Sequence, residues 1–588
     1  MTGSVSDGCD RPLVGRRAVL AATTGLTVGT SGCVRRVRSI VNRDGIDQLS
    51  LTITTVPADG DRESILLARA VRAAFEDAGM DVRIEMRSQE EFFRSVLINH
   101  DFDVYVGQHP GGVDPDYLYE ALHSRYVDEA GWQNPFGFSN LAFDDVLEAQ
   151  RAADGDDREE AVADTLEALA AEQPFVPICV PDEYRLARTD RFDGWDDASL
   201  ATRTALLGLE PVGDDADDRT LRVVHTDARP AENLNPLMVE YRDQGGIADL
   251  VYDSLATETD DGDVTPWLAT DWEWDDGTMT VDLREDCQFH DGETLTAEDA
   301  AFTYRFLADT TLGGDVAAPS PRYRGRVASV ESVDDLDEHR LELSFETGAP
   351  AAERALTVPV LPKHVWEERS EVPSVPGVRV AGGTTEALVT DNVPPIGSGP
   401  FRFTEWQERD YVAFERFDDH FTLEDGVDRP EPTVAALRVS IDPRSTSAIE
   451  RVADNDADVT TLPLESYVVD DVLESSREDV RVLETPSWSF YHLGFNARKA
   501  PFGNPRFRRV VGRLLDKEWL VEDVFDGHAR PVATPVTPEW VPDALEWNGE
   551  DPAVPFLGEG GRLNETAVRD AFEDAGFRHD GDRLRVSR

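Results

Sequence analysis

"CQFHDGETLTAEDAAFTY", residues 287–304, predicts a tight turn followed by the start of a helix. Thr296 and Asp299 have the spacing of a capping box, in which the carboxylate of the third helical residue reaches back to the cap. Glu298 and Asp299 also place negative charge in the first turn, where the helix dipole favours it. Apolar residues then recur at helical spacing: Ala300, Phe302, Phe306 and Leu307.

The same stretch carries a histidine among acidic neighbours, which raises the alternative of a metal site. His290, Asp291, Gly292 and Glu293 have the composition of a turn with glycine at its bend. Their spacing does not bring three ligands to one face, as a metal centre requires. We therefore interpret this stretch as a turn and a helix cap.

Length and composition indicate a large folded protein around this stretch. The chain has 588 residues, more than one hydrophobic core usually supports. Two or three domains, or one discontinuous two-lobed body, are therefore expected. Apolar residues make up 40% of the chain, and strand-like and helix-like patterns alternate in both halves, which predicts an α/β fold.

The charge balance is strongly acidic. The formal net charge is -60, from 117 acidic and 57 basic residues, and the lysines are Lys363, Lys499 and Lys517. Concentrated salt suppresses the self-repulsion of such a surface, because the screening length falls to about 3 Å at about 1 M. We interpret the chain as a protein of a salt-loving organism. Nucleic acid is excluded as a partner, since no basic face exists to neutralise phosphates.

The first residues have the pattern of an export signal. Arg16 and Arg17 precede an apolar run and then small residues before Cys33, which resembles a twin-arginine signal with a lipobox. We expect a signal peptide over 1–32, lipid attachment at Cys33 and a tether over 33–48 beside the membrane. The alternative is an uncleaved N-terminal anchor. Cys179 and Cys287 then remain, either paired or as buried free thiols.

Longer motifs give the chain a family resemblance. "PWLATDWEWDDGTMTVDLREDCQFHDGETLTAEDAAFTYRFLAD" (266–309) is similar to the signature region of family 5 of the extracellular solute-binding proteins. Those lipoproteins bind oligopeptides, dipeptides, nickel complexes or sugars for ABC importers. Further stretches follow in that family's order: 234–255, 358–367, 396–421, 444–460 and 490–531. The resemblance implies a two-lobed, periplasmic-binding-protein-like clamshell with a small inserted subdomain.

The order of these motifs differs from that family in one respect. Residues 49–86, 102–124 and 138–188 resemble the family's C-terminal third, yet they stand at the front of this chain. We infer a circular permutation, with the linker near 210–224. The expected organisation is a second lobe begun by 49–176 and completed by 488–588, a return and linker over 177–218, and a first lobe with its inserted subdomain over 219–487. The strand at 49–55 is therefore expected in the same lobe as 488–588.

The resemblance also implies ligand contacts by position. A glycine loop offers backbone groups, and a strand in the second lobe offers side chains, of which alternation sends about half to the cleft. Peptide-binding members carry a Trp and an amine-binding Asp before "DPD", where this chain has Gln108 and Gly111, so free-peptide binding is in doubt. The expected contacts are Gln108, His109, Gly397, Ser398, Gly399, Trp488, Tyr491, His492 and Asn496.

The sequence thus predicts a monomeric surface receptor for a peptide-like or other small polar solute, lipid-anchored outside the cytoplasmic membrane and serving an ABC permease. No nucleophile elbow, zinc-protease motif or phosphate-binding loop is found, and neither a cofactor nor catalytic activity is expected. Two alternatives remain open: a sensor or structural lipoprotein of the same family, and a metal-dependent surface enzyme.

Overall fold

The computed structural model describes residues 47–195, 200, 202–213, 219–238, 246–259, 261–373, 383–475, 477–485 and 487–586. The predicted signal, Cys33 and all but the end of the tether lie outside these residues. Among the helices of the described residues, none is both long enough and apolar enough to span a bilayer.

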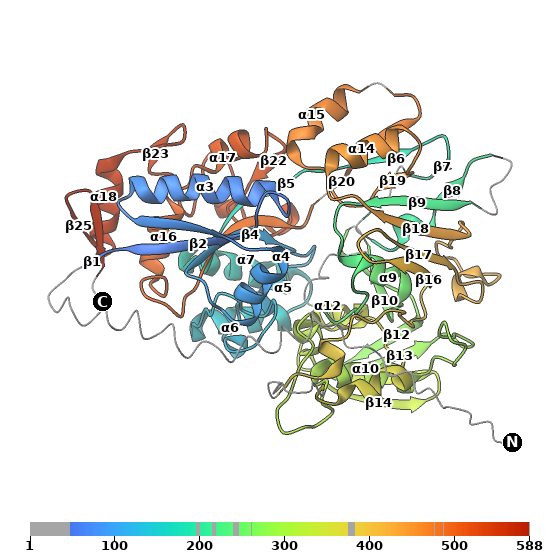
Figure 1. Cartoon of the computed structure of the whole chain (residues 1–588). Helices are drawn as coiled ribbons and strands as arrows, with labels where there is room; N and C mark the ends of the chain where they lie inside the picture. The colour runs from blue at the N-terminus through green and yellow to red at the C-terminus, as the bar shows by residue number, and fades with distance from the viewer. Residues whose placement is uncertain are drawn as a thin grey trace, which may run out of the picture.

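One lobe contains both ends of the described chain, blue and red in Figure 1. We call residues 47–181 and 487–586 the second lobe. Its sheet has the order β22-β5-β21-β4-β2-β3. The strands are β2 (Ser50–Thr55), β3 (Asp81–Met86), β4 (Val104–His109), β5 (Phe175–Pro181), β21 (Phe490–Phe495) and β22 (Ala529–Pro531). The predicted strand at 49–55 is β2, and it shares this sheet with β21, far away in the sequence.

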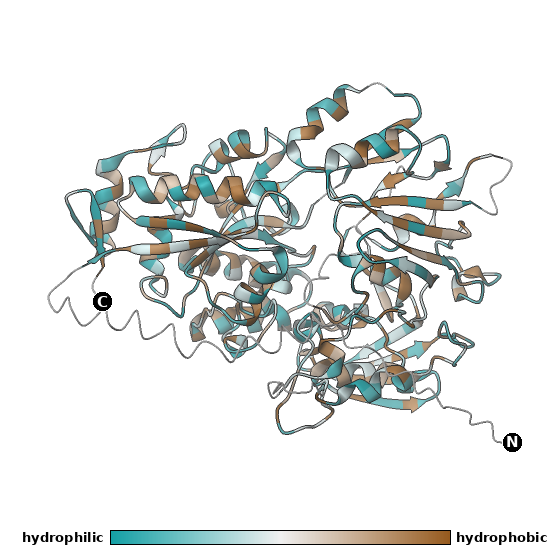
Figure 2. Ribbon diagram, in the orientation of Figure 1, coloured by the Kyte–Doolittle hydropathy of each residue, from teal (hydrophilic) through white to brown (hydrophobic). Residues whose placement is uncertain are grey.

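Helices from both segments cover the second-lobe sheet. They are α3 (Arg62–Asp77), α4 (Gln89–Phe93), α5 (Tyr117–Leu122), α6 (Leu141–Ala152), α7 (Gly155–Glu172), α16 (Pro505–Gly512), α17 (Lys517–Val524) and α18 (Glu565–Asp574). The apolar face of α3 packs with Leu493 and Phe572 in one buried cluster. Figure 2 shows the resulting alternation of hydrophilic and hydrophobic bands along α3. The front and rear segments therefore build one hydrophobic core.

A small sheet joins the first and last strands directly. β1 (Asp47–Gln48) pairs with β26 (Arg583–Val586), which also pairs with β25 (Arg578–Asp580). Gly79 ends α3 at φ +89°, and a Cβ added there would lie 2.4 Å from the backbone carbonyl oxygen of Asp582, which is a collision. The helix stop at Gly79 thus depends on close backbone approach as well as on the left-handed conformation.

The first lobe comprises residues 183–485 and has a seven-stranded sheet in the order β16-β17-β18-β9-β19-β6-β20. The strands are β6 (Glu183–Arg188), β9 (Thr220–His225), β16 (Phe401–Gln407), β17 (Tyr411–Arg416), β18 (Ala436–Ile441), β19 (Val459–Thr460) and β20 (Val480–Thr485). The helices outside the subdomain include α9 (Ile247–Val251), α12 (Ala349–Arg354), α14 (Ser445–Ala453) and α15 (Ser466–Glu474).

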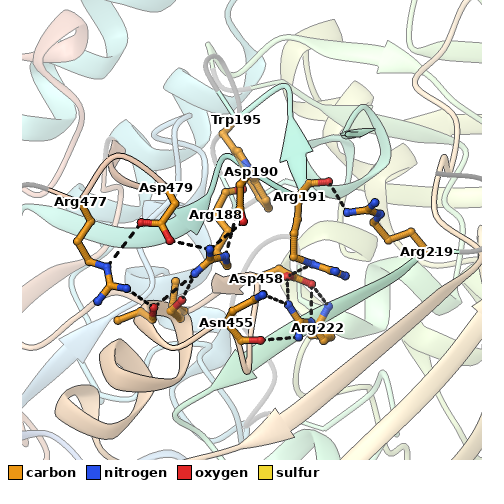
Figure 3. A network of polar contacts seen from close by, with 12 residues as sticks. Arg188, Asp190, Arg191, Trp195, Arg219, Arg222, Asn455, Asp458, Arg477 and Asp479 are labelled. Atoms are coloured by element: carbon orange, nitrogen blue, oxygen red, sulfur yellow. Dashed lines mark hydrogen bonds and ion pairs between the residues drawn. The ribbon is translucent and has the colours of Figure 1, made fainter. Parts of the chain in front are cut away.

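A buried polar network ties three strands of this sheet together (Figure 3). Asp458, just before β19, has no exposed side-chain surface and accepts hydrogen bonds from Arg191 Nε at 2.6 Å and Arg222 Nη2 at 2.6 Å. Arg188 at the end of β6 bonds Asp190 and Asp479. Because its partners come from β9, from the turn before β19 and from the end of β6, the network helps to fix the register of these strands.

The inserted subdomain contains the stretch that opened the sequence analysis. Its sheet has the order β12-β13-β15-β14, and α10 (Ala297–Ala308) packs against it. The strands are β12 (Ala269–Asp275), β13 (Thr278–Leu283), β14 (Val330–Asp337) and β15 (Arg340–Phe345). The predicted capping box is confirmed, since Thr296 N donates to Asp299 Oδ2 at 3.0 Å.

Two adjacent crossings connect the lobes. The chain passes from β5 to β6 through Asp182, and it returns from β20, which ends at Thr485, to β21, which begins at Phe490. β5 pairs with β21, and β6 pairs with β20, so the two crossings run side by side in opposite directions. Paired crossings of this kind form a hinge, because few backbone torsions must change for one lobe to rotate against the other.

The structure moves one expected boundary. The sequence places the return to the first lobe at 177, but β5 continues to Pro181 as a strand of the second-lobe sheet. Its apolar run reads as one buried strand, and only the polar Asp182 that follows marks the crossing. Cys179 lies on β5 and Cys287 in the first lobe, and both are buried free thiols.

Candidate functional site

A cavity of about 700 Å³ lies between the two lobes. In the second lobe it sits at the carboxyl ends of the parallel strands β2, β3 and β4, whose following loops open toward the first lobe. Such crevices are where open α/β sheets bind ligands. The volume is in the range of small-molecule sites. We call this cavity the cleft.

The second lobe contributes an aromatic and an acidic part of the cleft wall. Phe92 and Phe93 of α4 and the two tryptophans, Trp132 and Trp488, supply apolar surface. The loop after β2 supplies carboxylates and the start of α3: Asp59, Asp61, Arg62, Glu63 and Ser64. A wall that combines aromatic faces with a few polar groups suits a small polar solute.

The first lobe contributes both polar and apolar groups. They come from the loop after β9, the loop before α15 and single residues elsewhere. Asp227 accepts a hydrogen bond from Arg229 N at 2.9 Å and pairs with its guanidinium. Burial opposes the charged form, yet Arg229 keeps the pKa of Asp227 below its ordinary value. Arg185 is likewise neutralised, by Glu183 at 2.6 Å.

Asp61 is a strongly perturbed carboxyl of the cleft. It caps α3 by accepting from Ser64 N at 2.9 Å, and Tyr491 donates its hydroxyl to it at 3.2 Å. Burial, followed by the negative charge of Glu63, raises the pKa of Asp61 to about 6. Burial also raises the pKa of Glu465, opposite it. This part of the cleft therefore disfavours additional negative charge.

Direct contacts bridge the lobes on both sides of the cleft. Ser466 at the start of α15 donates its backbone N at 3.2 Å and its hydroxyl at 2.8 Å to Glu63 Oε1. On the other side, Arg354 of the first lobe lies 3.3 Å from Asp114 of the second and 2.7 Å from Glu258. The structure therefore represents a closed arrangement of the lobes.

Replacing Arg354 with Met should favour the open arrangement. The side chain bridges two carboxylates only when the lobes meet, so its loss penalises closure without touching the cleft. Coupling of this kind is worth about 1–3 kcal/mol, which corresponds to a roughly 5–150-fold weaker solute affinity. Small-angle X-ray scattering should show a larger radius of gyration for R354M than for R340M, whose exposed arginine pairs with Asp282 away from the cleft. Equal radii and affinities would contradict the assignment of this pair to closure.

Three of the sequence-predicted contacts line the cleft: Gln108, Trp488 and Tyr491. Gln108 donates its amide to Ser489 Oγ at 2.7 Å, so the ends of β4 and β21 meet at the wall. Gln108 and Tyr491 are also direct register partners on these two strands. The strand alternation expected from the sequence explains why Tyr491, and not its neighbour, lies here.

The remaining predicted contacts lie away from the cleft. His492 is fully buried beneath the sheet, 2.7 Å from the Tyr105 hydroxyl, and burial lowers its pKa to about 3. His109 is buried against Phe490 and Trp132. Asn496 donates to the carbonyls of His100 and Phe102, at 3.0 and 2.9 Å. These side chains organise the second-lobe core.

The glycine loop does not contact the cleft, although the sequence predicts that it does. Gly397, Ser398 and Gly399 are buried against the backbone of α9, where a Cβ on Gly397 would lie 2.0 Å from the Val251 carbonyl oxygen. His290, from the opening stretch, lies with its Nε2 2.9 Å from the Gly399 carbonyl. The loop therefore packs subdomain and lobe together, and none of its residues is part of the cleft wall.

Asp114 and Asp116 hold arginines instead of a ligand amine. Arg158 donates to Asp114 Oδ1 at 2.7 Å, and Arg151 lies 3.0 Å from Asp116. Asp116 precedes α5 but makes no side-chain cap bond to it. The described residues contain no group of three or more His, Cys, Asp or Glu side chains arranged to hold a metal ion.

Gly111 occupies the position where peptide-binding relatives were expected to carry an aspartate. Its φ is +62°, and a Cβ there would lie 1.9 Å from the carbonyl oxygen of Trp488. Gly111→Ala should therefore displace Trp488, weaken solute binding and lower stability by about 1–3 kcal/mol. Calorimetry measures the stability and the solute affinity of this variant. Gly560→Ala is the matched control, because Gly560 has a similar φ of +56° but open space around it. Equal losses in the two variants would contradict a role for the Trp488 contact.

Sequence reasoning missed several cleft residues, including Asp61, Glu63, Arg322 and Ser466. Only one signal was available for the first two: they follow the predicted strand at 49–55, and loops at the carboxyl ends of parallel strands bind ligands. Arg322 lies in a turn before a short helix, and Ser466 is the first residue of α15, so neither stands in a distinctive sequence pattern.

The hinge, the two α/β lobes and the cleft define a two-lobed fold of the periplasmic-binding-protein class. The model of bacterial extracellular solute-binding proteins, family 5 Middle, matches residues 263–586. The chain therefore belongs to family 5 of the extracellular solute-binding proteins.

Individual relatives are distant. The chain is 25% identical over 299 residues to the oligopeptide-binding protein AppA of Bacillus subtilis, covering 51% of this chain and 48% of that protein. It is 23% identical over 315 residues to the probable di/tripeptide-binding protein 5 of Pseudomonas aeruginosa, covering 51% and 55%. The chain thus spans about half the length of the curated relatives it matches.

Solved structures of similar proteins include NikZ from Campylobacter jejuni in complex with Ni(L-His). It has a TM-score of 0.46 and 17% identity, covering 63% of this chain and 67% of that one. AppA from Bacillus subtilis in complex with a nonapeptide has a TM-score of 0.42 and 19% identity, covering 61% and 66%.

Proposed function

We propose that the chain is an extracellular solute-binding lipoprotein that captures a peptide-like or other small polar solute and delivers it to an ABC-type importer. The observation that carries this proposal is the cleft: a cavity of about 700 Å³ enclosed by two hinged lobes that contact each other on both sides of it. A binding protein works by such closure, because the solute has higher affinity for the closed state than for the open one.

Uptake provides the test of this function. Solute released from the purified protein by denaturation is identified by mass spectrometry, and its import is then measured in cells with and without the gene. Loss of import in the deletion strain is the expected result. Normal import would favour the alternative of a sensor or structural lipoprotein, and chemical conversion of the solute by the pure protein would favour the surface enzyme.

Export and lipid anchoring are part of the proposal. The arginine pair and the small residues before Cys33 support a cleaved twin-arginine signal, followed by a lipid on Cys33 at the outer face of the cytoplasmic membrane. Mass analysis of the mature N-terminus checks this directly. An intact Met1 on protein recovered from the cytoplasm would contradict it.

We also propose that the chain is circularly permuted relative to its family. Support comes from the second lobe, where 47–181 and 487–586 share one sheet and one core, and where Asp47 pairs with Val586. A protein tolerates circular permutation when its original termini lie close together and the new termini fall at an exposed site. A rearranged chain that joins residue 586 to residue 47 by a short linker and opens between 211 and 219 should fold and bind the same solute. Failure of that chain to fold would contradict the proposal.

A further inference from the structure

Arg322 differs from the other arginines of the cleft wall because its charge has no carboxylate partner among the described residues. Arg185 and Arg229 each have a carboxylate partner, and Arg62 lies partly exposed, 3.8 Å from Glu63. Arg322 is only 8% exposed, and no carboxylate of the described residues lies within 4 Å of its guanidinium. A buried charge without a partner is costly, so its retention calls for an explanation.

The contacts of Arg322 leave donors available. Nη1 donates to the Pro236 carbonyl at 3.0 Å, and the guanidinium carbon lies 4.9 Å from the centre of the Tyr323 ring. Nε is buried without a hydrogen-bond partner among the residues that the structure describes. The Tyr323 ring and the Pro236 carbonyl hold the guanidinium in place, while some of its N–H groups have no acceptor among the described residues. Arg322 also lines both the cleft and a smaller neighbouring cavity of about 120 Å³.

We propose that Arg322 binds a carboxylate of the solute, an inference that rests on the proposed function of the cleft. A guanidinium matches the two oxygens of a carboxylate, and this geometry gives strong, directional pairing in a buried site. Closing the lobes over the solute thus supplies the missing counter-charge. The unpaired arginine keeps the empty closed form unfavourable, which couples closure to occupancy.

The rest of the cleft wall limits what else the solute carries. The cleft wall also carries Asp59, Asp61, Glu63 and Glu465. Burial and the negative charge of Glu63 already raise the pKa of Asp61 and of Glu465. A phosphate or a di-acid would bring further negative charge toward these groups. The inferred solute therefore has one carboxylate on a neutral or cationic body, with apolar surface for the aromatic part of the wall.

The test compares wild-type protein with R322Q, R322K and R340Q, all purified in molar salt. R340Q removes an exposed arginine far from the cleft and serves as the charge-matched control. Solute released by denaturation is quantified by mass spectrometry. Wild-type and R340Q should carry the same carboxylate-containing solute, R322Q at least about tenfold less, and R322K an intermediate amount, because a charged hydrogen bond is worth about 1.5–3 kcal/mol.

Emptied proteins give a second readout by thermal unfolding with trialanine or trialanine amide as probe. Empty R322Q should melt above empty wild-type, because it lacks the unpaired charge, whereas a merely structural arginine would lower the melting temperature when replaced. Trialanine should stabilise wild-type more than its amide does, and this difference should vanish in R322Q.

The outcomes separate the inference from the function. A solute without a carboxylate, or equal loading of wild-type and R322Q, overturns the role of Arg322 and leaves solute capture intact. Wild-type protein that carries no solute and responds to neither probe contradicts the proposed function itself, and the inference falls with it.

Discussion

Asp458→Ala should destabilise the first lobe by about 3–5 kcal/mol. Asp458 is fully buried and accepts from the backbone N of Arg222 at 2.8 Å and from the side chains of Arg191 and Arg222. Removing it leaves two guanidiniums beside each other at the edge of β19 without a counter-charge (Figure 3). Breaking a buried charge network costs far more than a surface pair contributes.

Denaturant unfolding in molar salt measures this loss. Asp456→Ala, an exposed aspartate two residues earlier in the same turn, is the matched control and should change stability by less than about 0.5 kcal/mol. Since the Asp458 carboxylate is fully buried, raising the salt further should not rescue D458A. A loss below about 1 kcal/mol, or rescue by salt, would show that the network contributes little to folding.

Asp551→Ala should produce a comparable loss of about 3–5 kcal/mol in the second lobe. The Lys517 side chain is 1% exposed, and its ammonium pairs with Asp551 and donates to the Val532 carbonyl at 2.8 Å. Asp551 Oδ1 also accepts from Ala553 N at 2.8 Å and Val554 N at 3.0 Å, so it holds the turn that carries Val554 into the core. Removing the Asp551 carboxylate leaves the buried Lys517 ammonium without this counter-charge, and it also loosens the turn.

Asp551→Asn separates these two contributions. The amide oxygen can keep the turn bonds while the charge is lost, so D551N should retain part of the stability that D551A loses. Glu550→Ala, at an exposed neighbouring position, should be close to neutral. If D551N and D551A were equally stable, the turn bonds would be irrelevant, and wild-type stability in D551A would contradict the ion-pair account.

Much of the fold is predictable from local pattern. The capping box of Thr296 and Asp299, the strand at 49–55 and the α/β alternation follow from hydrophobic period and helix-end chemistry, which act within a few residues. The shared lobe of the front and rear segments was accessible only through family resemblance, because the pairing of β2 with β4 and of β4 with β21 joins distant segments.

The site was predicted less well, for physical reasons. Alternation along β21 predicts that half of its side chains face the cleft, but it does not say which half. Tertiary packing determines that Tyr491 lines the cleft and that His492 is buried in the core. The glycine loop looked like a ligand-binding turn, yet its small residues serve close contact with α9. Arg322 became notable only once folding buried it without a carboxylate partner among the described residues, which no local pattern encodes.

The most direct test of the account is the distance between the lobes. Cysteines introduced at Glu76 on α3 and Leu473 on α15, both exposed, carry spin labels across the cleft. The native Cys179 and Cys287 are buried, which raises the pKa of the Cys287 thiol to about 12 and slows its labelling. Pulsed electron paramagnetic resonance compares the protein with its bound solute and after the solute has been removed. The account predicts one narrow distance in the loaded protein and a shifted, broader distribution in the empty one; identical distributions in both would contradict a hinged solute-binding clamp.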